Sequence, residues 1–221
     1  MSNFKTYKNF KGVKELNEDE EENPSMDMDM GMDMEVVMNQ PEENAISAPP
    51  ISMGAPIKPK TLDDVSGKLT QTLNKRIGDE YTAYYFYRNA ANWCKGMNYN
   101  KAGEFFEAEA ANELEHSKGL QDYLTQWNIF PTIPQAPTTM NFTSLVDVVN
   151  KAYEMEYDLL EKYCSDQKVF FDVHPATFNF IQKYVDFQNQ EVAEYSDLLN
   201  ALELIDTNNK LDVLFFEKNY F

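Results

Sequence analysis

Four long stretches in which apolar residues recur at helical spacing constrain this chain most strongly. They cover about residues 61–93, 100–126, 144–171 and 175–205. Only a few residues separate the members of each pair, whereas a connection with three prolines, residues 129–143, separates the two pairs. Short connections join antiparallel neighbours, and a long one can return the chain to the opposite end of a bundle. The sequence therefore predicts an all-α fold, a four-helix bundle with one long crossover connection.

Residues suited to helix ends flank these stretches. Thr61 and Ser144 can accept hydrogen bonds from the free amides of a first helical turn, and Pro175 suits the first position of a helix. Gly96 and Asn98 mark the end of the first helix, because both tolerate the left-handed conformation common after a helix. These signals predict a helix start at Thr61 and turns between the helices of each pair.

The first 60 residues differ in composition from the rest of the chain. Residues 11–80 contain no aromatic side chain, and eight of the eleven methionines lie before residue 60. An acidic run, an alternating Met/Asp run over residues 26–35 and a proline-spaced stretch follow one another. Such a segment cannot bury enough apolar surface to offset its ordering entropy. We predict a disordered acidic Met/Asp/Pro-rich arm over residues 1–60 and a folded domain over residues 61–221.

The start of this arm has a pattern of its own. Phe4, Tyr7 and Phe10 recur every three residues and alternate with lysines. An unstructured chain end is the simpler interpretation. The alternative is a short peptide that docks on a protein partner and folds there.

Charge and cysteine content narrow the function classes. The chain has 19 basic and 37 acidic residues, a formal net charge of -18, which argues against nucleic-acid binding and suits a protein that handles cations. Cys94 and Cys164 have no ligand-like spacing, so neither a disulfide framework nor a zinc site is expected. No apolar run approaches the ~20 residues of a membrane span, and the N-terminus lacks a secretory signal. We expect a cytoplasmic protein without nucleic-acid or membrane partners.

Each predicted helix carries potential metal ligands near its middle. The candidates are Glu80, Glu113, His116, Glu156, Gln188 and Glu191. Glu113 and His116 are three residues apart, as are Gln188 and Glu191, so each pair shares a helical face. A carboxylate on a buried face is costly unless something neutralises it, and carboxylate and imidazole ligands suit iron in either redox state. The pattern predicts a di-iron site in the bundle core, with Glu113 well placed to bridge the two ions.

These residues resemble the ferritin family, specifically the bacterial-type non-haem ferritins. The similarity covers about residues 65–215 and includes Glu113-Leu114-Glu115-His116 and the segment 176–185. By this resemblance, Glu80 and His116 bind one iron, Glu156 binds the second, and Glu113 bridges them. Gln188 and Glu191 match the fourth-helix pair of the family. Tyr87 falls where ferritins place a tyrosine beside the di-iron centre, where it supplies an electron or a hydrogen bond.

The resemblance implies a ferroxidase and iron-storage protein. Two Fe(II) ions per subunit would be oxidised by dioxygen or hydrogen peroxide, and ferric mineral would collect inside a homo-oligomer, in this family a 24-subunit shell. No haem is expected, because the methionine pattern of bacterioferritin is missing. A short fifth helix is expected at Leu211–Phe216. The positions of a third iron site hold Asn112, Phe187 and Gln190, none of them charged, so no third site is expected.

Two other functions compete with iron storage. The unusual arm raises the alternative of a ferritin-like structural, cargo or virion-associated protein that is targeted through residues 1–60. A di-iron enzyme that acts on an organic substrate is a third interpretation, but the sequence contains no obvious substrate pocket.

Overall fold

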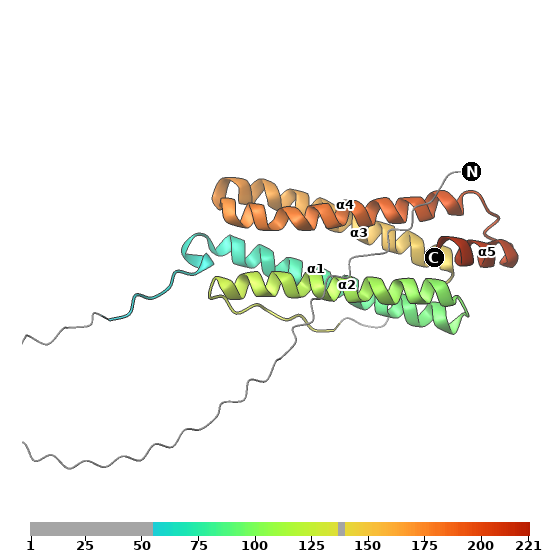
Figure 1. The fold of residues 1–221 in the computed structure, drawn as a ribbon, viewed down its shortest axis with the longest axis horizontal. Coiled ribbons are helices and arrows are strands. Elements are labelled where there is room, and N and C mark those ends of the chain that lie inside the picture. Colours follow the sequence, from blue (N-terminus) through green and yellow to red (C-terminus); the bar gives the residue numbers. More distant parts are fainter. Residues whose placement is uncertain (1–54, 137–139) are drawn as a thin grey trace, which may run out of the picture. The chain divides into compact units, whose positions relative to one another are not determined.

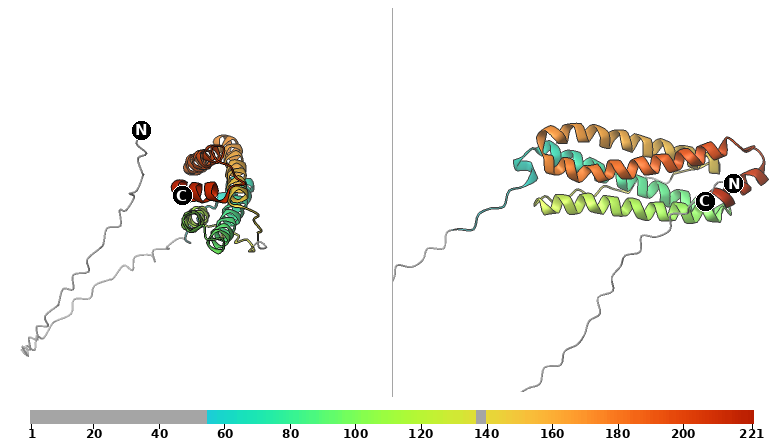
Figure 2. Two further views of the ribbon diagram at one scale, coloured as in Figure 1. Left: turned by 90° about the vertical axis from the view of Figure 1, so that its right-hand side faces the viewer. Right: turned by 45° about the horizontal axis from the view of Figure 1, so that its top comes forward.

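The computed structural model describes residues 55–136 and 140–221, which form a long helical bundle (Figure 1). Its elements are a 3-10 helix, Leu62–Asp64, followed by α1 (Gly67–Gly96), α2 (Asn100–Gln126), α3 (Leu145–Val173), α4 (Pro175–Leu202) and α5 (Lys210–Tyr220). Two antiparallel hairpins, α1 with α2 and α3 with α4, lie side by side (Figure 2). The predicted all-α four-helix bundle with a short fifth helix is confirmed. Most of the predicted arm, including its possible docking peptide, lies outside the described residues, so the division at residue 60 stays a prediction.

Local signals form the turn of each hairpin. Asn98 has a left-handed φ of 65°, and the Tyr99 amide after it donates to the Cys94 carbonyl at 2.9 Å, which ends α1. His174 alone separates α3 from α4 and is extended, as expected for a residue that precedes proline. Both pairs therefore fold as tight hairpins.

The first helix begins later than predicted. A 3-10 turn follows Thr61, where the Asp64 carboxylate accepts a hydrogen bond of 2.6 Å from the Thr61 amide. Leu62 within this turn is fully buried, so the turn is anchored in the core. The chain then restarts as α1, with the Ser66 hydroxyl accepting from the Lys68 amide at 3.3 Å. The bounds of α2 are those predicted, and α3 and α4 end close to the expected residues.

The long connection follows α1 along the outside of the bundle. Near its start, the Thr132 amide donates to the side chain of Asn74 at 2.7 Å. Near its end, the ring of Phe142 packs against Phe86 and Trp93, further along α1. The helix rises about 1.5 Å per residue, so the connection spans roughly 20 Å of α1 between these contacts. It therefore acts as the predicted crossover and lets α3 run antiparallel to α1 (Figure 1).

Two apolar clusters form the core, and the predicted metal ligands lie between them. One cluster includes Ala83 and Phe106, and the other includes Ile77 and Leu120. Each of the four long helices contributes one segment to each cluster, and a buried polar residue lies between those two segments. These residues are Glu80, Glu113, Glu156 and Gln188. The bundle thus surrounds a short polar layer with apolar packing on both sides.

The fifth helix covers one end of the bundle. Phe216 is fully buried against the first apolar cluster, and the Glu217 carboxylate accepts hydrogen bonds from the backbone amides of Lys101 and Ala102. A carboxylate at this position also suits the positive end of the α2 dipole. None of the helices in the described ranges is long and apolar enough to cross a membrane.

Candidate metal centre

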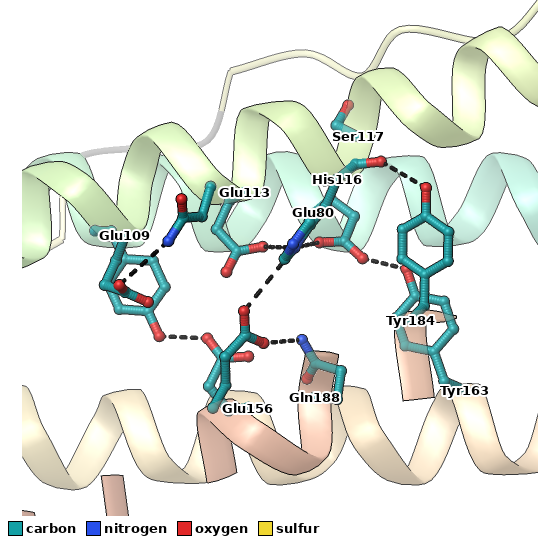
Figure 3. Close-up of polar contacts among 12 residues, drawn as sticks. Glu80, Glu109, Glu113, His116, Ser117, Glu156, Tyr163, Tyr184 and Gln188 are labelled. Carbon is teal, nitrogen blue, oxygen red and sulfur yellow. Dashed lines mark hydrogen bonds and ion pairs between the residues drawn. The ribbon is translucent and has the colours of Figure 1, made fainter. Parts of the chain in front are cut away.

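All six predicted ligands meet in the polar layer (Figure 3). Ligand atoms of Glu80, Glu113 and His116 lie within 4.8 Å of one another, and so do those of Glu113, Glu156 and Glu191. Glu113 belongs to both groups, as expected for a bridging carboxylate. The two groups form two adjoining half-sites, each of which could hold one metal ion.

Buried polar atoms without a hydrogen-bond partner gather here. Within the described ranges, both oxygens of Glu113, one oxygen each of Glu80, Glu156 and Gln188, and Nδ1 of His116 have no partner. An unpaired buried polar atom normally costs about 1–3 kcal/mol. So many at one point are explained if the layer is built to bind cations.

His116 faces the carboxylates through Nδ1. This atom lies 3.4 Å from Glu113, 3.7 Å from Glu80 and 4.0 Å from Glu191. The imidazole ring stacks on Phe187 with the centroids 4.8 Å apart and the planes 6° apart. This stacking helps to fix the orientation of the imidazole ring.

Two buried tyrosines donate hydrogen bonds to candidate ligands. The Tyr87 hydroxyl on α1 donates to Glu156 on α3, and the Tyr163 hydroxyl on α3 donates to Glu80 on α1. The predicted hydrogen-bonding position of Tyr87 beside the centre is thus present in the structure. Tyr163 was not among the predicted site residues. Its signal was available, because Tyr163 follows Glu156 by the same seven residues that separate Tyr87 from Glu80.

Three of the candidate carboxylates, Glu113, Glu156 and Glu191, have raised pKa values. Burial raises the pKa of Glu113 well above its usual range, and the neighbouring charge of Glu80 raises it further. Burial likewise raises the pKa of Glu156 to about 7, although the hydrogen bond from Tyr87 opposes this shift. Burial and the charge of Glu156 raise the pKa of Glu191 to about 9. Cations that bind here must displace these protons.

A pocket of about 220 Å³ gives access to the centre between α2 and α4. Its lining includes the three uncharged residues at the expected positions of a third iron site, Asn112, Phe187 and Gln190. Two carboxylates that the sequence reading did not assign to the site, Glu109 and Glu194, also line the pocket. Burial and the charge of Glu194 raise the pKa of Glu109 to about 8.

Comparison with known proteins identifies the family. The family model described as "Ferritin-like domain" matches residues 70–205, which include every candidate ligand. The chain belongs to the ferritin family. Among the curated ferritins, the bacterial non-heme ferritin of Campylobacter jejuni is 31% identical over 144 residues, covering 64% of this chain and 86% of the relative. The bacterial non-heme ferritin of Staphylococcus epidermidis is 26% identical over 145 residues, with 64% and 86% coverage.

Solved ferritin structures share the fold. A novel open-pore ferritin from the hyperthermophilic archaeon Archaeoglobus fulgidus superposes with a TM-score of 0.66 at 22% identity. That similarity covers 70% of this ferritin and 96% of the archaeal chain. A humanized archaeal ferritin gives the same TM-score and identity. These structures confirm the ferritin fold, and the match to the curated bacterial non-heme ferritins confirms the predicted resemblance.

Proposed function

We propose that this protein is a ferroxidase and iron-storage protein that oxidises Fe(II) at the layer formed by Glu80, Glu113, His116, Glu156, Gln188 and Glu191. The observation that carries the proposal is the convergence of unpartnered buried oxygen and nitrogen atoms from four helices. Oxygen ligands with a single imidazole suit iron in both oxidation states. Membership of the ferritin family supports the same assignment.

Charge supports two ions per subunit. The site contains four glutamates and one imidazole. The ionised glutamates carry a charge of about −4, which the charges of two Fe(II) ions balance. The two half-sites share Glu113, so the ions would be bound close together. The chain's own residues bind both ions, orient them and exclude bulk water from the buried side.

Oxidation requires one electron from each Fe(II). Dioxygen, or hydrogen peroxide as the alternative oxidant, accepts both electrons, and the resulting Fe(III) releases protons as it hydrolyses. Tyr87 would hold Glu156 in place through the hydrogen bond that its hydroxyl donates.

Large apolar side chains on the bundle surface support assembly into a homo-oligomer. Phe130 is 96% exposed, Leu204 79% and Phe171 64%. Exposed side chains of this size can pack against other copies of the chain when an oligomer forms. We infer a closed homo-oligomer, with the 24-subunit shell as its expected form, inside which the ferric product collects. The alternative of a structural or cargo protein finds no specific support in the described residues.

Aerobic Fe(II) loading followed by size-exclusion chromatography tests this function, with iron and protein measured in each fraction. We expect many irons per subunit to co-elute with a large assembly. A Glu113→Ala/His116→Ala variant should oxidise Fe(II) much more slowly. The matched control is Glu115→Ala/Lys118→Ala, which changes two exposed residues on the same turns of α2 and should behave as the parent.

Two outcomes would overturn parts of the proposal. Binding of only about two irons to a small oligomer would retain the di-iron centre and reject storage. Equal oxidation rates in the parent and the Glu113→Ala/His116→Ala variant would reject the centre itself.

A further inference from the structure

Tyr163 occupies a position that the proposed reaction does not yet use. The side chain is fully buried on α3, and its hydroxyl donates to Oε1 of Glu80 on α1. The other oxygen of Glu80, Oε2, has no hydrogen-bond partner among the described residues and lies 3.7 Å from Nδ1 of His116. One carboxylate oxygen is therefore held by the protein, and the other is free to bind a metal ion.

A second tyrosine–glutamate hydrogen bond joins the same two helices in the opposite direction, from α1 to α3. Tyr87 follows Glu80 by seven residues on α1 and donates to Glu156, while Tyr163 follows Glu156 by seven residues on α3 and donates to Glu80. Seven residues are about two helical turns, so each tyrosine lies on the same face as the glutamate of its own helix. Because α1 and α3 run antiparallel, this spacing is self-complementary (Figures 1 and 3).

The surroundings of Tyr163 fix its ring. The ring stacks on Tyr184 with centroids 5.3 Å apart and planes at 21°, and the Arg76 guanidinium lies 5.9 Å from the ring centroid. Arg76 is itself held by ion pairs to Asp79 at 2.8 Å and Asp166 at 3.1 Å. A hydroxyl on so constrained a ring can hold the Glu80 carboxylate in one orientation.

We propose that Tyr163 is a positioning residue that sets the affinity of the centre for the ion bound by Glu80 and His116. The assignment rests on the proposed function. It makes Tyr163 the counterpart of Tyr87, so that each half-site has one carboxylate held from the opposite helix. Outer residues of this kind typically contribute about 10–100-fold to metal affinity.

Anaerobic Co(II) titration of the full chain tests the proposal through the visible absorption of the bound ion. The absorption of the ion bound by Glu80 and His116 is identified as the part of the spectrum that is missing in a His116→Ala variant. A Tyr163→Phe variant, which keeps the ring and removes the hydroxyl, should bind this ion about 10–100-fold more weakly and the other ion as the parent does. In a Glu80→Ala background, which removes the acceptor of this hydrogen bond, Tyr163→Phe should cause no further loss.

Tyr123→Phe is the matched control. Tyr123 is also buried in the bundle, but its hydroxyl pairs with Thr177 and with no candidate ligand, so neither Co(II) affinity should change. Thermal unfolding of each metal-free variant verifies that the fold is retained.

The outcomes separate this proposal from the proposed function. Unchanged affinity in Tyr163→Phe, equal weakening of both ions, or the same loss in the Glu80→Ala background would overturn the positioning role alone. A parent chain that binds no pair of ions would overturn both.

Discussion

Glu217 on α5 accepts a hydrogen bond of 2.6 Å from the backbone amide of Lys101, in the first turn of α2. The two residues lie 116 positions apart in the sequence, and Glu217 is only 2% exposed. A glutamate on the last helix thus caps one of the four long helices of the bundle. Free amides at a helix start need such a partner.

Replacing Glu217 with alanine is expected to lower the free energy of unfolding by about 1–3 kcal/mol, because the cap is lost and the α2 amides become unpaired. Chemical denaturation of the metal-free protein measures the change. Glu217→Gln retains an acceptor oxygen and should lose less. Equal losses in the two variants would show that the acceptor is not what stabilises this junction.

The metal-free protein is expected to lose stability as the pH rises from about 5 to 9. The folded-state pKa values of Glu156, about 7, and Glu191, about 9, exceed the ordinary value of 4.5. The folded protein therefore holds protons that the unfolded chain releases. This stabilisation is complete below pH 4.5 and is lost as the pH rises through the folded-state values.

Melting temperatures at pH 5, 7 and 9 test this expectation. Saturating Co(II) should flatten the trend, because the ions replace the protons. A Glu156→Gln/Glu191→Gln variant should also show a flatter profile without metal. A melting temperature that rises with pH in the metal-free parent would contradict the assignment of raised pKa values.

Glu113→Leu is expected to stabilise the metal-free fold while it abolishes the centre. Both oxygens of Glu113 are fully buried and have no hydrogen-bond partner within residues 55–136 and 140–221. Replacing such a group by an apolar side chain of similar volume can raise the free energy of unfolding by about 1–3 kcal/mol. Denaturation without metal gives the stability, and Co(II) titration should show that both ions are lost. A less stable variant would indicate that Glu113 has a structural role.

Gly119→Ala is expected to destabilise the protein by about 1–3 kcal/mol, although alanine favours a helix. A Cβ atom at Gly119 would lie 2.6 Å from the Tyr184 hydroxyl, which donates to the His116 carbonyl at 3.1 Å. The ring would have to move away from α2. Gly78→Ala is the control, because a Cβ there meets nothing within 4 Å and should stabilise α1 by up to ~1 kcal/mol. Thermal unfolding compares both, and a stabilised Gly119→Ala variant would contradict the predicted clash.

Much of the fold could be predicted from residues close together in the sequence. The features that could not be predicted depend on contacts between residues far apart in the sequence. The bounds of α2 follow from residues close to each end, such as Asn98. The candidate ligands could be predicted because buried charge at helical spacing is unusual. The hydrogen bond from Tyr163 to Glu80 joins residues 83 positions apart. The seven-residue spacing from Glu156 places Tyr163 on the same helical face, but only the packed bundle shows which carboxylate its hydroxyl meets. The predicted start of α1 was wrong. Leu62 is buried in a separate 3-10 turn before the helix, and its burial depends on the packed bundle.

The uneven enclosure of the centre has a kinetic consequence. Glu80, Glu113 and Glu156 are sealed from solvent, whereas the side chains of His116 and Glu191 remain 14% and 12% exposed beside the pocket between α2 and α4. An ion can therefore arrive and depart through one side while the helices stay packed. We therefore expect the residence time of a bound ion to be governed by the breaking of its bonds to the ligands of its own half-site, and not by the slow fluctuations that open a bundle.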